Sequence, residues 1–425
     1  MTDSHETCGC GEYRALSRRG FMSVAGAQVA ALSLPSWMPD VAYRESEDTS
    51  RDVIVSIFMR GGADGLTLVA PFADPLYYSG RPTIAVPRPD SSSPVRGVAL
   101  DNFFMFPQAM LGMYPAYQAG DLAIVHATGQ RFTNSRSHFE AERYMEAGKP
   151  NDYSLVTGWL ARHLATSSPS RANAPLRALA LGWGGTRLTL TGAPRTLPIP
   201  VPGSYNLVTP VGPQLDRMFA GAWAPARSAA RDGIATVNLL KAIDFRGYRP
   251  ANGATYSNTD FNQGMRSLAA LIKADVGVEA AHLDIGGWDT HANQGSTGGQ
   301  MHQLMTDFAN GIGAFWADVV KAPTNYRVTL VAISEFGRNA RENGSQGTDH
   351  GRGSVAFVLG TSIAGGRVLA QWPGLSQDVL EDGQDLKVTI DYRDILAEIV
   401  TTRLGNPNLS YILPGYTPVL RGITK

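Results

Sequence analysis

Short runs of β-branched and other apolar residues recur along the chain, and each run ends in a polar, glycine-rich loop. Residues 53–58 read VIVSIF and lead into RGGADG, and residues 122–127 read LAIVHA and lead into TGQRFTNSRSH. Residues 281–285 run into GGWDTH, and residues 328–333 run into SEFG. Runs of this length and composition predict buried β-strands that deliver polar residues at their C-terminal ends.

Helical patterns separate these predicted strands. Residues 137–145 predict a helix capped by Asn134 or Ser135, and residues 299–320 carry apolar side chains at helical spacing. The alternation of strands and helices predicts an α/β fold with parallel crossover connections. Ligands bind such sheets at the carboxyl edge of the strands. Residues 188–202, rich in Thr, Pro and Gly, predict an irregular excursion rather than a domain linker.

Composition indicates a globular body and excludes one class of partner. The 425 residues, 43% of them hydrophobic, suffice for a single α/β domain, which we place at residues 52–425. The 37 basic and 37 acidic side chains cancel, and no long basic run is available to follow a phosphate backbone. We therefore expect no nucleic-acid partner. We also expect no permanent membrane span, because no apolar segment is long enough.

The N-terminus carries an export pattern. Residues 17–22 read SRRGFM and precede an apolar run of small residues that extends to residue 34. This pattern is typical of a twin-arginine signal, and the alternative is a basic helix followed by a short core helix. We expect the signal and the start of a linker at residues 1–40, a linker at 41–51, the twin-arginine translocase as a partner, and a periplasmic or secreted protein. Cys8 and Cys10 precede the arginines, so the mature body is expected to lack cysteine.

Carboxylates and imidazoles gather in three of the polar loops. Asp349 and His350 are adjacent in GTDHG, Asp289 and His291 share WDTH, and Asp64 lies in the first glycine-rich loop. One carboxylate oxygen and one imidazole nitrogen can bind the same divalent metal ion, with zinc, calcium and manganese as candidates. The plainer alternative is that the aspartates cap turns or helices and the histidines are solvated.

A fourth polar cluster, NSRSH, lies where a predicted strand turns into a helix. Backbone N–H groups at a helix N-terminus stabilise negative charge. Arg136 could hold a phosphate or sulfate through two parallel hydrogen bonds. His138 could instead pack under the helix as a structural residue. That four strand ends supply such residues favours a functional site at this edge.

Five motifs together resemble one known family. They are RGGADGL at 60–66, RSHF at 136–139, GWDTH at 287–291, SEFGR at 334–338 and GTDHG at 347–351. They are similar to motifs of the bacterial domain of unknown function numbered 1501, whose members often carry twin-arginine signals. That family is in turn similar to the alkaline phosphatase and sulfatase superfamily. The resemblance implies an alkaline-phosphatase-like three-layer sandwich with a mostly parallel central sheet flanked by helices.

The superfamily resemblance also implies metal ligands. Asp64, Asp349 and His350 would share one metal, and Asp289 and His291 would belong to a second position. Two departures favour a single metal: the histidines end at His350, and the spacing of Asp289 and His291 is narrower than in two-metal members.

The same resemblance implies a nucleophile at a helix N-terminus. That position corresponds to Ser137, with Ser135 and Thr133 as substitutes, while the lack of cysteine in the mature region excludes the sulfatase route through a modified cysteine. With Ser137, Arg136 and His138 as the catalytic residues, the expected function is a metal-dependent hydrolase of a small-molecule or polymeric phosphate or sulfate ester. The alternative is a non-catalytic secreted protein that keeps the fold and binds a surface polymer or assists envelope assembly.

Overall fold

The computed structural model describes residues 51–171, 174–182, 184–204, 217–322 and 326–425. The expected signal, with Cys8 and Cys10, and nearly all of the expected linker lie outside the described residues; Arg51 already belongs to the first strand. Within the described ranges, no helix combines the length and the apolar character that crossing a bilayer requires.

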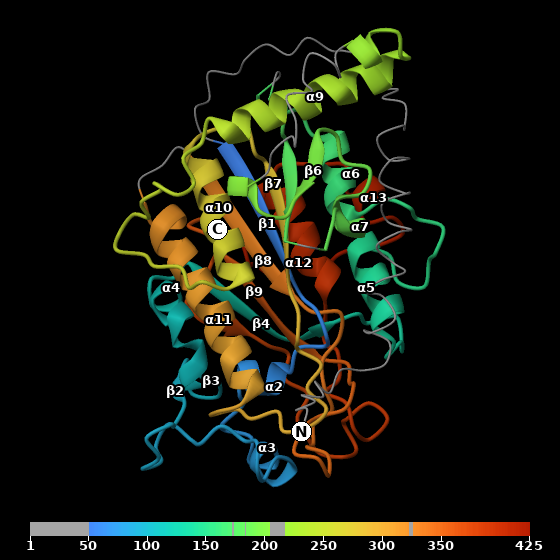
Figure 1. The fold of residues 1–425 in the computed structure, drawn as a ribbon. Helices are drawn as coiled ribbons and strands as arrows, with labels where there is room; N and C mark the ends of the chain where they lie inside the picture. Colours follow the sequence, from blue (N-terminus) through green and yellow to red (C-terminus); the bar gives the residue numbers. More distant parts are fainter. Residues whose placement is uncertain (1–50, 172–173, 183, 205–216, 323–325) are drawn as a thin grey trace, which may run out of the picture.

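Strands and helices alternate along the chain (Figure 1). The strands are β1 (Arg51–Met59), β2 (Val98–Ala99), β3 (Met105–Phe106), β4 (Leu122–Gly129), β5 (Ala178–Leu181), β6 (Thr196–Ile199), β7 (Ala280–Ile285), β8 (Tyr326–Ile333), β9 (Ser354–Leu359), β10 (Arg367–Leu369) and β11 (Ile390–Asp391). The α-helices are α2 (Gly65–Leu68), α3 (Pro75–Gly80), α4 (Tyr114–Gln118), α5 (His138–Ala147), α6 (Trp159–Thr166), α7 (Arg187–Leu190), α9 (Ala224–Lys241), α10 (Asp260–Lys273), α11 (Gln300–Phe315), α12 (Tyr392–Glu398) and α13 (Leu409–Ile412). Tighter or wider helical turns are η1 (Gln108–Met113), η2 (Pro202–Ser204), η3 (Trp316–Val320) and η4 (Ile399–Arg403).

One large sheet organises the described part of the chain. Its strand order is β10-β4-β9-β8-β1-β7-β5-β6, and β11 pairs with the end of β4. The pairs of β1 with β7 and β8, and of β5 with β6 and β7, are parallel. Between β4 and β8, β9 runs antiparallel to both neighbours. The sheet is therefore mostly parallel, and the start of β9 lies at the edge where its neighbours end.

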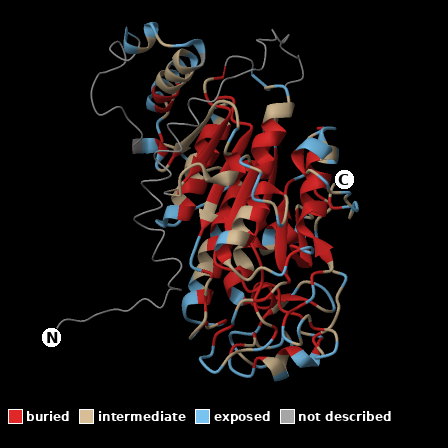
Figure 2. Cartoon of the chain, turned by 90° about the vertical axis from the view of Figure 1, so that its right-hand side faces the viewer, coloured by how far each residue is buried: buried red, intermediate tan, exposed pale blue. Residues whose placement is uncertain are grey.

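Helices cover both faces of this sheet (Figure 1). Because side chains alternate along a strand, Val55 and Ile57 of β1 pack in one apolar core with α10 and α11, whereas Ile54 and Phe58 pack in another with α5, α6 and α12. Buried residues fill the strands and the inner sides of the helices (Figure 2). The expectation of a mostly parallel central sheet flanked by helices is confirmed.

The four predicted strands correspond to β1, β4, β7 and β8, and the predicted helix at 299–320 corresponds to α11 followed by η3. Two local expectations are wrong. Residues 188–202 include β6, which pairs with β5 at the edge of the sheet, where Pro198 is tolerated because one side of an edge strand needs no backbone donor. The N-cap position of α5 is occupied by Ser137, not by Asn134 or Ser135, and the Ser137 side chain makes no capping hydrogen bond.

Candidate metal centre

The loops that carry the candidate side chains meet at the carboxyl edge of the sheet. Asp289 and His291 follow β7, and His138 opens α5 after β4. His350 precedes β9 and reaches the same edge because β9 runs opposite to its neighbours. An antiparallel bridge between Arg338 and His350 joins the loop after β8 to the loop before β9.

Three imidazoles converge through their Nε2 atoms. His350 Nε2 lies 3.1 Å from His138 Nε2 and 3.0 Å from His291 Nε2. Asp289 Oδ1 lies 3.5 Å from His138 Nε2, 3.0 Å from His291 Nε2 and 3.1 Å from His350 Nε2. Ligand atoms of His138, Asp289 and His350 all fall within 4.8 Å of one another. Three nitrogens and one carboxylate oxygen thus share a small volume.

The Nδ1 atom of each ring faces an oxygen acceptor. The three contacts are His350 Nδ1 to the carbonyl oxygen of Arg136 at 2.8 Å, His291 Nδ1 to Asp349 Oδ1 at 3.0 Å and His138 Nδ1 to Glu335 Oε1 at 2.7 Å. Because these oxygens accept, each Nδ1 donates, and a neutral ring then presents the lone pair of Nε2 to the cluster. Histidines that bind metals are commonly oriented by such a contact on their other nitrogen.

Glu335 ties His138 to the loop after β1. Its side chain is fully buried, and Oε1 also accepts hydrogen bonds from the backbone N–H groups of Gly61 at 2.8 Å and Gly62 at 3.0 Å. The hydroxyl of Ser334 donates to Oε2 at 2.9 Å. With both oxygens held, Glu335 fixes the plane of the His138 ring.

Asp289 is the acidic group of the centre. Arg338 Nη2 donates to Oδ1 at 2.5 Å, while the buried Oδ2 has no hydrogen-bond partner in the described part of the chain. Burial would raise the pKa of Asp289, but hydrogen bonds from His138, His291 and His350 and the charge of Arg338 outweigh burial and lower that pKa. Asp289 is thus poised as an ionised carboxylate with one uncommitted buried oxygen.

These residues fit a divalent cation. Nε2 lone pairs that face each other at 3.0 and 3.1 Å repel unless a proton or a cation lies between them. Zinc bonds of about 2.0–2.1 Å in tetrahedral geometry separate neighbouring ligand atoms by roughly 3.3 Å. The distances from Asp289 Oδ1 and His350 Nε2 to each other and to the other two ligand atoms, 3.0–3.5 Å, are close to this value. Imidazole nitrogens suit zinc and related transition metals, whereas calcium prefers six to eight oxygens. The donor set therefore favours zinc among the expected metals.

The pKa values show the same demand for positive charge. Burial alone would lower the pKa of His138, yet hydrogen bonds and charges of Asp289 and Glu335 raise it to about 9. A hydrogen bond with Asp289 likewise raises the pKa of His291 in spite of burial. The carboxylates thus favour positive charge on His138 and His291, and a bound metal would supply positive charge at the same place.

The candidate ligands are distributed differently from the superfamily pattern. That pattern divides three of them between two metal positions, but in the structure they lie in one cluster: Asp289, His291 and His350. Asp349 stands behind His291, where its half-exposed carboxylate accepts from His291 Nδ1 and from Asn343 Nδ2. Burial would raise the pKa of Asp349, but the hydrogen bonds from His291 and Asn343 outweigh burial and lower that pKa. Asp349 thus orients a ligand.

Asp64 lies outside the cluster. Its fully buried carboxylate pairs with Arg81 at 2.5 and 3.0 Å and accepts from Thr67 and Gln294, each at 2.7 Å. Burial would raise the pKa of Asp64, but the charge of Arg81 together with the hydrogen bonds from Arg81, Thr67 and Gln294 outweighs burial and lowers that pKa. This carboxylate already has a full set of partners and a counter-ion, so the structure does not bring it to Asp349 and His350.

The expected catalytic residues lie beside the cluster. Ser137 stands between Arg136, whose carbonyl holds His350, and His138, and its side chain makes no capping hydrogen bond to α5. The guanidinium of Arg136 pairs with Asp385 at 2.5 Å and with Asp382 at 3.2 Å. A phosphate or sulfate would have to compete with these carboxylates for Arg136.

The two substitute nucleophiles are engaged in local hydrogen bonds. Ser135 Oγ donates to Glu140 at 2.8 Å and accepts from the backbone N–H of Ser137 at 3.2 Å. Thr133 Oγ1 accepts from the backbone N–H of Ser135 at 3.2 Å. Of the three hydroxyls, that of Ser137 has no hydrogen bond to its own loop among the residues that the structure describes.

Three residues contribute to the centre in ways that the sequence did not predict. His138, expected to be catalytic, lies among the ligand atoms, and Glu335 and Arg338, for which no role was expected, contact His138 and Asp289. The available signal was their position directly after a predicted strand, in a segment that also holds Phe336. Glu335 and Arg338 flank Phe336 at a strand end. Charged residues so close to a buried aromatic residue are expected to be buried themselves and to pair with other groups.

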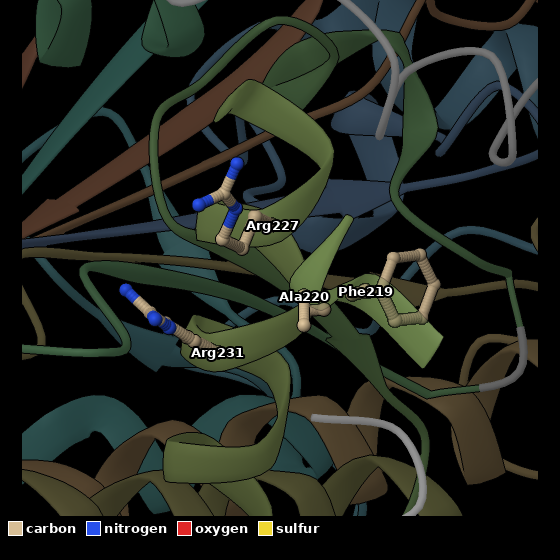
Figure 3. A pocket seen from close by; sticks show the side chains of 5 residues that line it. Phe219, Ala220, Arg227 and Arg231 are labelled. Atoms are coloured by element: carbon tan, nitrogen blue, oxygen red, sulfur yellow. The ribbon is translucent and has the colours of Figure 1, made fainter. Parts of the chain in front are cut away.

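One hollow lies beside the centre, and another lies far from it. Gln130, Thr133, Ser135, Glu335, Phe336 and Arg352 line a small one next to the Glu335 end of the centre. A larger one, at the helix α9, is lined by Phe219, Ala220, Arg227, Ala230 and Arg231 (Figure 3). In Figure 1, α9 stands at the opposite end of the molecule from α2, which directly follows the loop after β1. The larger hollow is therefore remote from the cluster.

Comparisons with known proteins locate one family match. The model of a family described as "Protein of unknown function (DUF1501)" matches residues 229–405. No curated protein matches the chain. Among solved structures, the chain is similar to one titled "Crystal structure of Ps i-CgsB in complex with k-i-k-neocarrahexaose", with 10% identity, a TM-score of 0.37, and coverage of 86% of this chain and 74% of that chain.

Proposed function

We propose that this protein is a metal-dependent hydrolase of phosphate or sulfate esters, built on an alkaline-phosphatase-like three-layer sandwich. The observation that carries the proposal is the convergence of three imidazole Nε2 atoms on Asp289 Oδ1, with every Nδ1 committed to an oxygen acceptor. Such an arrangement offers four ligand atoms to a metal ion and orients each histidine through its other ring nitrogen. Both features are typical of metal sites in proteins.

His138, His291, His350 and Asp289 would hold the metal. When bound, a divalent ion supplies a Lewis acid that polarises an ester oxygen. Exposure of the side chains is uneven, at 2% for His138, 16% for His350 and 31% for His291, so substrate would approach from the side of His291 and His350. Glu335 and Asp349 keep the rings oriented from behind.

Ser137 is the proposed nucleophile. It is held at the start of α5 between two residues that both contact His350, and its hydroxyl is free of a capping hydrogen bond. In-line attack by this hydroxyl on phosphorus or sulfur would form an ester on Ser137 and break the bond to the alcohol, and the hydroxyl proton would pass to the departing alkoxide. Water would then cleave the serine ester, which releases phosphate or sulfate and restores the hydroxyl. The N-terminus of α5 would stabilise the negative charge on the transferred group.

The test combines metal content with hydrolysis. The mature protein is purified, its metals are measured, and aryl phosphate, aryl phosphodiester and aryl sulfate are assayed with and without chelator. Asp289→Asn should lose both metal and turnover. Asp64→Asn is the matched control, because Asp64 also follows a strand at this edge but binds Arg81; its folded fraction should keep the metal.

Three results would contradict the proposal. The proposed metal centre would be refuted if the wild-type protein held no metal. It would also be refuted if the Asp289→Asn variant kept the metal content of the wild type. Metal without turnover on any of the three substrates would favour the non-catalytic secreted protein that binds a polymer or assists envelope assembly.

We also propose export through the twin-arginine translocase to the periplasm or beyond. The supporting feature is Arg18-Arg19 before the apolar run of residues 23–34. A protein that gains its metal before it crosses the membrane would suit a route that carries folded cargo. Replacement of both arginines by lysine should retain the full-length chain in the cytoplasm, as judged by cell fractionation; unchanged export would refute this route.

A further inference from the structure

Arg338 is a fully buried cation whose donors reach the loops around the candidate metal centre. Its Nε donates to the carbonyl oxygen of Gly62 at 2.6 Å and its Nη1 to that of Thr348 at 3.0 Å. Its Nη2 donates to the carbonyl oxygens of Gly61 and of Trp288, the latter at 3.1 Å, and to Asp289 Oδ1 at 2.5 Å. One side chain thus joins the loops after β1, β7 and β8 and the loop before β9.

Four of these five acceptors are neutral carbonyls. Among the hydrogen-bond partners described for this guanidinium, Asp289 is the one carboxylate. A buried arginine needs a counter-ion, so Arg338 and Asp289 fix each other in place. The planar guanidinium also defines the direction from which Oδ1 is held, which a flexible ammonium would not do.

Arg338 is in addition connected to a second ligand. Its backbone forms an antiparallel bridge with His350, and the N–H groups of Asn339 and Gly351 continue this pairing with Asp349 and Gly337 at 2.9 Å. The residue whose side chain orients Asp289 therefore lies on the segment that places His350. Neither contact makes Arg338 a ligand, because a guanidinium carries no lone pair to offer a metal.

We propose that Arg338 is the positioning residue of the metal centre: by donating to Asp289 Oδ1, it holds this oxygen close to the Nε2 atoms of the three histidines. This inference rests on the proposed metal centre and adds what sets its geometry. It accounts for the position of Asp289 Oδ1, which accepts from Arg338 and also lies 3.0–3.5 Å from the three Nε2 atoms. It also gives a role to a charge that the hydrolysis itself does not use.

Arg81 provides a matched control for a purely structural role. It is also a fully buried arginine, it pairs with the carboxylate of Asp64, and it donates to the carbonyl oxygens of Asn339 and Ala340 at 2.8 and 2.9 Å. Its removal would disturb the segment next to Arg338 without removing a contact to any of the four candidate ligands.

The experiment titrates metal-stripped full-length protein with Co²⁺, whose visible absorption reports ligand geometry, and then displaces Co²⁺ with Zn²⁺. Arg338→Met should weaken Co²⁺ binding about 10- to 100-fold and change the cobalt spectrum. Arg338→Lys should recover part of the affinity, because its ammonium can still donate to Asp289. Arg81→Met should lower the melting temperature while its folded fraction keeps the wild-type affinity and spectrum.

The outcomes separate this inference from the proposed function. Wild-type affinity and spectrum in Arg338→Met, or an equal loss in Arg81→Met, would overturn the positioning role while leaving the metal centre intact. A wild type that takes up no Co²⁺ or Zn²⁺ would overturn both. Where Arg338→Met yields no folded protein, Arg338→Lys decides: an unperturbed cobalt spectrum refutes the role, and a perturbed spectrum at reduced affinity supports it.

Discussion

Asp64 and Asp289 each follow a strand at the same edge of the sheet, and their neighbours separate their roles. Arg81, Thr67 and Gln294 satisfy both oxygens of Asp64. Asp289 shares Oδ1 with Arg338 and the imidazoles and leaves Oδ2 without a partner in the described residues. A carboxylate with a complete set of donors stabilises the fold, whereas one with an unsatisfied buried oxygen is available to a ligand.

The hydroxyl of Ser137 gives a prediction at the residue scale. If Ser137 attacks the ester, Ser137→Ala should reduce kcat roughly 100-fold or more while metal content stays at the wild-type level. Ser135→Ala is the control, because the Ser135 hydroxyl is spent on Glu140 and on the backbone of Ser137. Steady-state kinetics with the best aryl ester would show the difference. Equal activity in both variants would exclude Ser137 as the nucleophile.

His126 gives a second residue-scale prediction, for stability against pH. Its Nε2 donates to the carbonyl oxygen of Val69 at 2.9 Å, and its Nδ1 accepts from the backbone N–H of Ala127 at 2.8 Å. Burial outweighs the contact with Val69 and lowers the pKa of His126 to about 4. Protonation would also place a second donor against the Ala127 N–H.

The sign follows from the two pKa values. Above the unfolded pKa of about 6.5 both states are neutral, but between 6.5 and 4 only the unfolded state binds the proton, so stability falls as pH falls. Between pH 7.5 and 5 this histidine should cost about 2 kcal/mol of unfolding free energy. Urea unfolding at pH 7.5 and pH 5 gives the unfolding free energy at each pH. The difference between the two values should be smaller by that amount in His126→Gln than in the wild type. An unchanged dependence would contradict the assignment.

At the scale of elements, apolar runs predicted the central strands because β1, β4, β7 and β8 are buried on both faces and so read as continuous hydrophobic segments. The edge strand β6 was not predicted because it contains Pro198 and is only partly buried. The antiparallel direction of β9 also left no local signal, since direction is set by pairing with β4 and β8. That direction is what brings His350 to the edge.

The close approach of the loops after β1 and β7 gives a prediction at this scale. Gly61 has φ of +117°, and a Cβ there would lie 2.6 Å from the backbone nitrogen of Asp289. Gly61→Ala should therefore destabilise the fold by roughly 3 kcal/mol or more and weaken metal binding. Gly120→Ala is the control, because Gly120 also has positive φ, at +75°, but nothing within 4 Å of an added Cβ.

Gly120→Ala should cost about 1 kcal/mol, the backbone penalty alone. Denaturant unfolding and Co²⁺ titration of both variants check the two parts of this prediction. Equal destabilisation in the two variants would contradict the prediction, because it would show that the loops after β1 and β7 can move apart without a further cost in stability.

At the scale of the whole molecule, the centre is assembled from residues far apart in the chain. His138 and His350 are 212 positions apart, yet their Nε2 atoms lie 3.1 Å from each other. The sequence could predict that polar loops share one edge of the sheet, because the strand order of an α/β fold places them there. It could not predict which carboxylate meets which imidazole, because that depends on loop paths such as those joined by Arg338. The ligands are therefore close together only in the folded chain.

A metal that binds the folded state alone must stabilise that state. At a free concentration 100 times its dissociation constant, the metal should add about 2.7 kcal/mol to the unfolding free energy. The measurement compares thermal and urea unfolding of metal-stripped protein with and without added Zn²⁺. His350→Ala should abolish the increment, because His350 Nε2 contacts all three other ligands. His302→Ala, on α11, is the control and should retain it. If Zn²⁺ stabilised His350→Ala as much as the wild type, the ion would be bound elsewhere and the convergence of imidazoles would not be the metal site.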